Sequence, residues 1–197
     1  MGFDLYGLNP KLKGKKPIIN WEAKPTQEEK DEYFKAIAKF ETENVGYYFR
    51  NNVWWWRPLA QYVLVLMSND FTEDEQKYWH HNDGFKVNDQ KAKKIADRLE
   101  QELNTGRVSE RAHYHEIEMK KAKEKNELLE EKRKELEKIV EQKTGEKLAP
   151  VKYPEPFKSQ WDDIQKQYDW SESYPFSEDN VMDFMRFCRH SGGFKIC

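Results

Sequence analysis

The stretch GYYFRNNVWWWRPLAQY, residues 46–62, is the densest run of aromatic side chains in the chain. Three adjacent tryptophans stand among tyrosines, a phenylalanine, two arginines and two asparagines. A helix or strand that buries one face uses only part of such a set, because neighbouring side chains point in different directions. We therefore expect at least one of these rings in a core. The others either complete that core or form a surface.

The local pattern predicts an extended or irregular segment over Asn51–Arg57, followed by a helix over Pro58–Met67. Proline suits a first helical turn. The apolar residues after it recur at helical spacing: Leu59, Tyr62, Val63 and Leu66. In an extended segment, Trp54 and Trp56 point to one side and Trp55 to the other.

The residue types of this stretch suit a planar anionic ligand such as a nucleotide. Indole faces stack on bases or hold cations, arginine pairs with phosphate, and asparagine reads amide or purine edges. The alternative is that the rings only fill the core, with Arg57 packed on one of them and the asparagines in a turn. Together with a later turn, the candidate ligand-binding residues are Arg50, Asn51, Asn52, Trp54, Trp55, Trp56, Arg57, Asn82 and Asp83.

Length and composition indicate one domain, or one domain with an appendage. The chain has 197 residues, of which 36% are charged and 14% aromatic, with a formal net charge of −2. Aromatic residues bury much area each, so a few of them build a core while the charge lies elsewhere. The charge balance does not favour general nucleic-acid binding. The apolar run Tyr62–Met67 is too short to span a membrane.

Helix signals flank the aromatic stretch. Thr26–Glu29 and Thr72–Glu75 are capping boxes, which predict helices to about Asn44 and through Trp79. Asn82-Asp83-Gly84 predicts a turn, and Asn88 or Asp89 caps a further helix. The apolar stripe of that helix comprises Ala92, Ile95, Ala96, Leu99 and Leu103.

The composition changes over Arg107–Lys147, where charged residues predominate. A sparse seven-residue repeat places Val108, His115, Ala122, Leu129 and Leu136 at one position. It places Ala112, Met119, Asn126, Arg133 and Val140 at a second. The pattern predicts a long charged helix, in a solvated arm, a hairpin-like projection or a weak coiled coil.

The C-terminal part continues with the linker Ala149–Pro156, a short helix over Trp161–Trp170 and a helix capped by Ser177. Ser191-Gly192-Gly193 either cradles an anion or ends that helix, and Phe194–Cys197 is apolar enough to be docked. We thus predict a mainly α fold. Residues 1–106 and 149–197 form a compact aromatic-rich helical core domain, and residues 107–148 form a charged, coiled-coil-like helical arm inserted in it.

The sequence holds little that indicates catalysis. It has no nucleophile elbow, phosphate loop or dinucleotide-binding glycine motif. His80 and His81, and likewise His113 and His115, point apart on a helix, so no metal site is expected, and no cofactor is indicated. Cys188 is expected in the core, and with only two cysteines in the chain a reducing cytoplasm is the expected setting.

Four motifs together resemble a group of small uncharacterised proteins of bacteriophages and prophages: GFDLYGLNP (Gly2–Pro10), YFRNNVWWWRPL (Tyr48–Leu59), NDG (Asn82–Gly84) and SGGF (Ser191–Phe194). The resemblance implies an accessory viral protein in the cytoplasm of the host bacterium, and such proteins often inhibit or decoy host systems. We expect a non-enzymatic binding protein that sequesters a nucleotide-like host defence signal. The alternative is a protein–protein inhibitor or structural accessory protein acting through 107–148, by self-association or on a host protein; a catalytic role ranks third.

Overall fold

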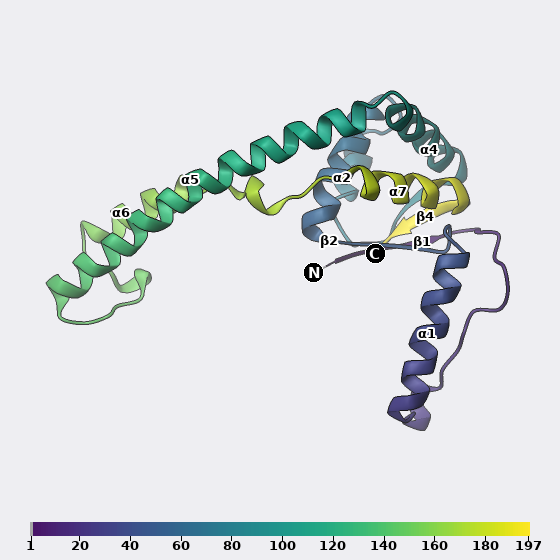
Figure 1. Cartoon of the computed structure of the whole chain (residues 1–197), viewed down its shortest axis with the longest axis horizontal. Helices are drawn as coiled ribbons and strands as arrows, with labels where there is room; N and C mark the ends of the chain where they lie inside the picture. Colours follow the sequence, from purple (N-terminus) through teal and green to yellow (C-terminus); the bar gives the residue numbers. More distant parts are fainter. Residues whose placement is uncertain (1) are drawn as a thin grey trace. The chain divides into compact units, whose positions relative to one another are not determined.

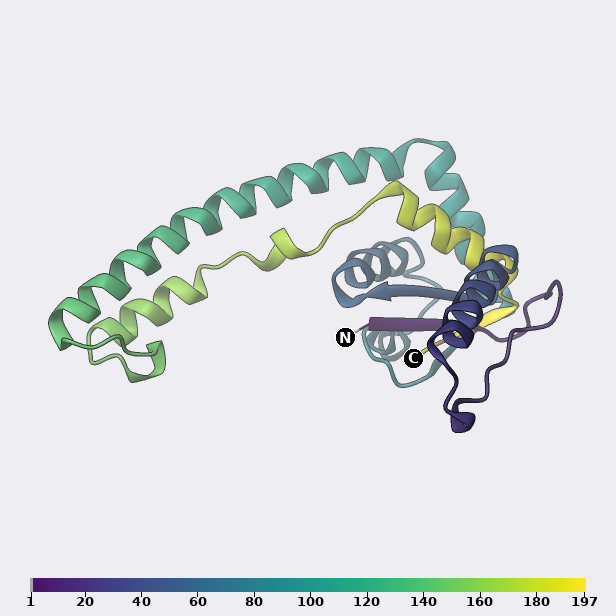
Figure 2. The ribbon, with the colours of Figure 1, turned by 60° about the horizontal axis from the view of Figure 1, so that its bottom comes forward.

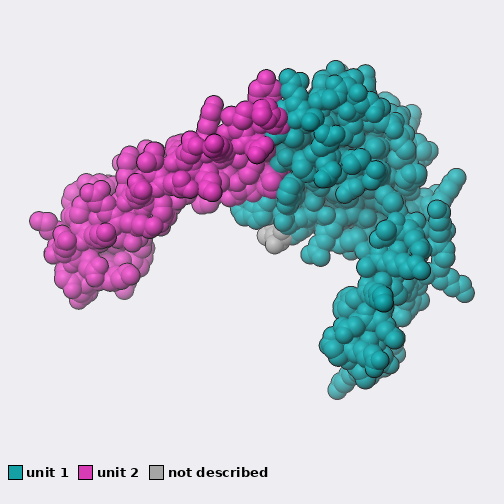
Figure 3. Space-filling model, viewed as in Figure 1, with its two compact units in different colours: residues 1–112, 176–197 teal, residues 113–175 magenta. Residues whose placement is uncertain are grey.

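A computed structural model describes residues 2–197. Contacts divide the chain into two compact units (Figure 3). Unit 1 comprises residues 1–112 and 176–197, and unit 2 comprises residues 113–175. Each unit has its own hydrophobic cluster.

Unit 1 is built on a four-stranded antiparallel sheet, which the sequence analysis did not predict. Its strands are β1 (Gly2–Gly7), β2 (Tyr48–Asn52), β3 (Phe85–Asn88) and β4 (Gly193–Ile196), in the order β2-β1-β4-β3. The first and last strands are therefore neighbours at the centre of the sheet. Along β1, Phe3 and Leu5 are buried and alternate with Asp4 and Tyr6 on the other face.

Three helices of unit 1 cover one face of this sheet (Figures 1 and 2). They are α2 (Val53–Leu66), α4 (Asp89–Asn104) and α7 (Glu178–His190). The core between the layers is rich in aromatic rings, and its fully buried members include Trp56, Trp79, Phe184, Phe187 and Phe194. The aromatic core is confirmed, as is the mainly helical fold, to which the sheet is an addition.

The two capping boxes begin helices as predicted. Thr26 caps α1 (Gln27–Glu43), and Thr72 caps α3 (Glu73–Tyr78). A short 3-10 helix, Trp21–Ala23, precedes α1. The helix α1 buries only Phe40, whose ring contacts Tyr47 near the start of β2.

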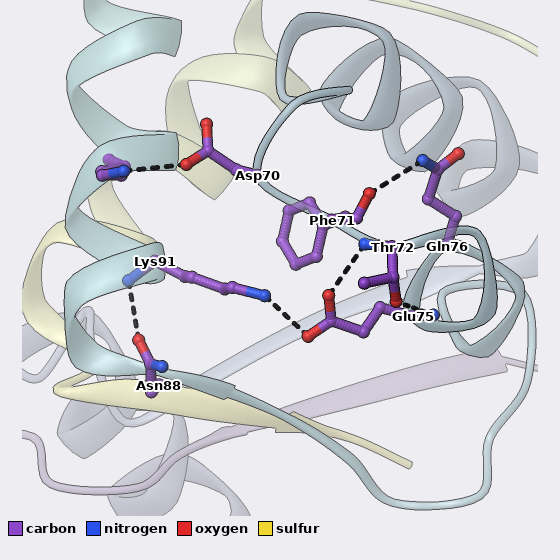
Figure 4. Close-up of polar contacts among 8 residues, drawn as sticks. Asp70, Phe71, Thr72, Glu75, Gln76, Asn88 and Lys91 are labelled. Carbon is purple, nitrogen blue, oxygen red and sulfur yellow. Dashed lines mark hydrogen bonds and ion pairs between the residues drawn. The ribbon is translucent and has the colours of Figure 1, made fainter.

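Polar contacts fasten α3 to α4 (Figure 4). The Glu75 carboxylate accepts the N–H of Thr72 at 2.9 Å and also pairs with the Lys91 ammonium at 2.6 Å. That ammonium lies 4.6 Å from the centroid of the Phe71 ring. Asn88 caps α4 by accepting the Lys91 N–H at 2.8 Å. Lys91 therefore links the start of α4, through its backbone, to the start of α3, through its side chain.

Unit 2 consists of most of α5 (Arg107–Thr144) and the segment that returns along it. The returning segment contains α6 (Phe157–Lys166) and two 3-10 helices, Pro150–Lys152 and Trp170–Ser173. The α6 bounds differ from the predicted 161–170. Residues 149–175, which the sequence analysis assigned to the core domain, pack on α5 in the structure: Tyr153 and Trp161 cluster with Leu136 and Val140.

The seven-residue repeat correctly marks the buried face of α5, but no second long helix covers it among the described residues. The buried positions are Val108, His115, Ala122, Asn126, Leu129, Leu136 and Val140. Within unit 2 the returning chain covers this face. The Asn126 amide donates to the Asp169 carbonyl at 2.8 Å and accepts the Asp169 N–H at 2.9 Å. Arg133, which interrupts the repeat, lies 4.4 Å from the Trp161 ring centroid. A hairpin-like arrangement is found, and a coiled coil is not.

Candidate functional site

The helix α2 begins five residues before Pro58, so the expected extended path through the tryptophans is wrong. Asn52 is the N-cap, and its side-chain oxygen accepts the N–H groups of Trp54 at 3.0 Å and Trp55 at 3.1 Å. This cap satisfies donors that a first helical turn otherwise leaves open. The three indoles therefore fan out around a helix instead of alternating across a strand.

The three tryptophans have different environments as a result. Trp54 keeps 42% of its surface exposed, Trp55 is half-buried, and Trp56 has none exposed. The Trp56 indole donates to the Trp79 carbonyl at 2.7 Å and stacks on the Trp79 ring at 5.8 Å. Trp56 is a core residue. The sequence analysis listed Trp56 among the ligand-binding residues, but in the structure its ring is fully buried.

Both asparagines of the segment also have structural roles. Asn51 faces the helices and donates to the side chain of Asn180 in α7 at 3.0 Å. Asn52 uses its oxygen to cap α2. Arg50 lies on the opposite face of the sheet, exposed, with its Nε 3.5 Å from the Asp4 carboxylate.

The fold brings the predicted turn close to the end of β2. The Asn82 amide donates to the Gly2 carbonyl at 2.8 Å, and Gly2 is paired with Asn52 in the sheet. Asp83 is exposed and lies 3.9 Å from His81. Burial lowers the pKa of His80, and the positive charge of Arg57 lowers it further. The exposed Arg57 therefore lies near the segment that contains His80, Asn82 and Asp83.

The predicted residues share one region of unit 1, but they line none of the four cavities described below. Four surface cavities formed by described residues take their linings from other segments, and none includes a residue from 50 to 57. Small-molecule sites normally bury most of the ligand in a concavity.

A cavity of about 570 Å³ lies elsewhere in unit 1. Four segments line it: residues 9–13 after β1, residues 43–46 before β2, the first turn of α4, and residues 189–192 at the end of α7. Its lining residues are Asn9, Pro10, Lys11, Lys13, Glu43, Asn44, Val45, Gly46, Asp89, Lys93, Arg189, His190 and Gly192. The volume is within the range of nucleotide-sized ligand sites.

Close backbone contacts hold these segments together. A Cβ on Gly46 would lie 2.1 Å from the His190 carbonyl oxygen, and one on Gly192 would lie 2.4 Å from the Asn9 carbonyl oxygen. The N–H of Asn9 donates to the Ser191 carbonyl at 3.0 Å. Only glycine fits such approaches. The GLNP and SGGF motifs at the two ends of the sequence therefore build one wall of the cavity.

A buried asparagine fixes the loop that carries the cavity's first two lysines. Asn44 accepts the Lys13 N–H at 2.6 Å and donates to the carbonyls of Lys13 at 3.2 Å and Phe40 at 2.8 Å. All three hydrogen bonds join the Asn44 side chain to backbone groups. Asn44 therefore positions the loop rather than a ligand.

The lining carries more positive than negative charge. Lys93 pairs with Asp89 at 2.7 Å, and Arg189 pairs with Asp97 at 2.7 Å and with Glu100. The ammonium groups of Lys11 and Lys13 have no ion-pair partner among the described residues. They are the cations in the cavity that are available to a ligand.

The sequence analysis did not select Lys11 and Lys13. It left Ser191–Gly193 open between an anion cradle and a helix end; α7 ends at His190, with Ser191 as its C-cap and both glycines at positive φ. The only sequence features that point to this cavity are the GLNP and SGGF motifs near the two ends of the sequence, and their positions in the sequence do not show that they come into contact.

Over residues 2–197, no group of three or more metal-ligating side chains is placed to hold an ion, and no helix has the length and apolarity needed to cross a membrane. Burial raises the pKa of the Cys188 thiol, consistent with its expected core position. Comparison with protein-family models, curated proteins and solved structures finds no match for this chain.

Proposed function

We propose that this protein binds a phosphate-bearing small molecule of nucleotide size in the cavity of unit 1. The observation that carries the proposal is the 570 Å³ space with two unpaired lysines, Lys11 and Lys13, on a loop that Asn44 fixes. Lysine ammonium groups are common phosphate ligands. The cavity replaces residues 50–57 as the main site.

The remaining lining suits the rest of such a ligand. Glu43 and Asp89 present carboxylates, and Asn9 presents an amide, all of which bond to sugar hydroxyl groups. No phenylalanine, tyrosine or tryptophan is among the described lining residues, and the imidazole of His190 is the one ring there on which a base could stack. The proposed ligand is therefore held mainly by its phosphate and sugar.

With the resemblance to phage and prophage proteins, the binding proposal extends to a role. We place the protein in the cytoplasm of an infected bacterium, where it sequesters a nucleotide-like signal of the host's defence. Sequestering needs affinity and abundance and no catalytic group. The ring system of the signal is left to the binding experiment, because the lining does not select a base.

Native mass spectrometry of the purified protein, before and after mild denaturation, is the first test. A released phosphate-bearing molecule supports the proposal and gives its composition. Calorimetric titration with mononucleotides, cyclic dinucleotides, pyrophosphate and inorganic phosphate follows. Lys11→Ala and Lys13→Ala should each weaken binding about tenfold, the value of a charged hydrogen bond at a partly exposed site. Lys35→Ala, an exposed lysine of α1 that does not line the cavity, is the matched control.

Two results would overturn the proposal. One is that none of these phosphates binds and none is released. The other is that a phosphate binds with the same affinity to the lysine variants and to the control, because the cavity cations would then play no part.

A second function is favoured by a separate observation on α5. Ile117, Leu128 and Ile139 are 39%, 61% and 38% exposed, and they follow one another at 11-residue intervals, which keeps them on one side of a helix. This stripe, and not the covered seven-residue seam, is what α5 offers a partner protein. If Leu128→Gln abolishes the effect of the protein in infected cells while Lys13→Ala leaves it intact, the protein–protein role is the correct one.

A further inference from the structure

We propose that the sheet face opposite helices α2, α4 and α7 binds single-stranded nucleic acid. We call this surface the open face and define it by Asp4, Tyr6, Tyr48, Arg50, Lys86 and Lys195. Helices α2, α4 and α7 all pack on the other face (Figure 2). The inference is independent of the cavity, since no open-face residue lines it.

The strand register aligns four open-face side chains in one row across the whole sheet. Tyr48 of β2 pairs with Tyr6 of β1, Tyr6 pairs with Lys195 of β4, and Lys195 pairs with Lys86 of β3. Directly paired residues point to the same face of a sheet. Adjacent strands lie about 4.8 Å apart, so the row extends roughly 14 Å, with two rings at one end and two ammonium groups at the other.

The aromatic end of the row is accessible and pre-arranged. Tyr6 keeps 42% of its surface exposed, and its ring centroid lies 5.2 Å from that of Tyr48. The Tyr48 hydroxyl donates to the Asp4 carboxylate, which fixes the ring over the sheet. Exposed rings on a rigid sheet are the usual stacking surface for unpaired bases.

The charge of the open face is positive, although that of the chain is −2. Among the six residues that define it, Asp4 alone carries a carboxylate, and Asp4 is engaged by Arg50 at 3.5 Å and by Tyr48. Cys197, which exchanges backbone hydrogen bonds with Asp4, is a second negative neighbour of Tyr6. Lys86 and Lys195 have no ion-pair partner among the described residues, and the Arg50 side chain is 66% exposed. Overall composition does not predict this surface, because only the pairing of four distant strands gathers its cations.

An open, flat surface with rings beside cations fits an extended polyanion better than a small molecule. Phosphates of a strand lying along the row meet Lys195 and Lys86 while bases stack on Tyr6. A duplex conceals its base faces and cannot use the rings. An acidic peptide satisfies the lysines but gains nothing from the tyrosines. These differences in binding distinguish the three kinds of partner.

Fluorescence anisotropy with a labelled 12-nucleotide oligothymidine tests the proposal on the full chain. Three phosphate contacts, from Arg50, Lys86 and Lys195, predict a binding constant that falls about 20-fold between 50 and 200 mM salt. In Lys86→Gln/Lys195→Gln, which keeps one contact, the fall should be only about threefold. Tyr6→Thr, which keeps a strand-forming residue, should bind about tenfold more weakly through loss of stacking.

The matched controls carry the same chemistry away from the open face. Tyr114→Ala removes a tyrosine that is 55% exposed on α5, and Lys39→Gln/Lys77→Gln removes two exposed lysines of α1 and α3. Both should bind as the wild type does. Circular dichroism melting of every variant shows whether the sheet is retained.

The proposal fails if the folded Tyr6→Thr variant binds as tightly as the wild type. It also fails if a 12-base-pair duplex or a 12-residue polyglutamate binds as tightly as the oligothymidine, or if the oligothymidine does not bind at 50 mM salt. A loss of binding in Lys13→Ala with none in Tyr6→Thr would place the nucleic acid at the cavity and also overturn the assignment to the open face.

Discussion

Replacing Gly46 by alanine tests the close backbone contact behind the cavity. The new Cβ would lie 2.1 Å from the carbonyl oxygen of His190, 2.2 Å from its carbon and 2.7 Å from the nitrogen of Ser191. All three atoms are backbone, so no side-chain rotation relieves the overlap. The end of α7 and the segment before β2 must move apart by more than 1 Å to reach an ordinary contact of about 3.4 Å.

The expected cost is about 3 kcal/mol of unfolding free energy, the upper part of the usual range for overpacking. The separation also strains the sheet edge, where Gly7 donates to the Tyr47 carbonyl at 3.0 Å. For a chain of this size the cost corresponds to a fall in melting temperature of roughly 10 °C. Ligand binding in the cavity should weaken as well, because two of its walls separate.

Urea denaturation followed by tryptophan fluorescence measures the effect. Gly106→Ala is the matched control, because Gly106 has a φ of +74° but nothing within 4 Å of an added Cβ. That variant should lose only about 1 kcal/mol through left-handed backbone strain. If Gly46→Ala is no less stable than Gly106→Ala, the two segments do not approach each other this closely.

Three further predictions concern other parts of the chain. Hydrogen bonding to Arg107, together with the positive charges of Arg107 and Arg98, lowers the pKa of the buried Glu102 carboxylate. The ionised carboxylate therefore stabilises the folded protein above about pH 5, and this stabilisation is lost as the pH falls through the lowered folded-state pKa. Glu102→Gln should therefore be about 2 kcal/mol less stable at pH 7 and indistinguishable from the wild type at the lowest pH that keeps both folded, as measured by urea titration at several pH values. Asn126→Ala should speed amide hydrogen exchange in residues 169–173 by more than tenfold, since about 2 kcal/mol of buried hydrogen bonding is lost; unchanged exchange would contradict the role of Asn126. Trp56→Ala should cost about 4 kcal/mol and Trp54→Ala less than about 1 kcal/mol in urea unfolding, and equal losses would contradict their different burial.

Helix signals in this sequence were readable because they are local. A capping box needs four residues, and both boxes, at Thr26 and Thr72, begin helices in the structure. The stripe of α4 is buried at Ala92, Ile95, Ala96 and Leu99 for the same reason: one helix presents one face. The repeat along α5 also marked its buried face correctly.

The strands escaped prediction because they are short and pair over long distances. In β1, Phe3 and Leu5 alternate with polar neighbours, but three alternations are too few to distinguish a strand from an irregular terminus. The sequence also did not show what covers α5. An apolar repeat identifies the buried face of a helix, but it does not show whether a second helix or a returning segment of the same chain packs on that face. The candidate site shows the same limit. The density of tryptophans could be seen in the sequence. The contact between residues 9–13 and 189–192 could not, because it forms only when β1 and β4 pair in the folded sheet.

The central position of β4 has a consequence for synthesis on the ribosome. During translation β1 and β2 emerge early and pair with each other, but the place between β1 and β3 stays empty until residues 193–196 leave the exit tunnel. Unit 2, which spans residues 113–175, leaves the tunnel before that moment. The nascent chain therefore passes through a stage in which unit 2 is complete while the aromatic core of unit 1 still lacks β4, and in that stage the core is exposed to chaperones and proteases.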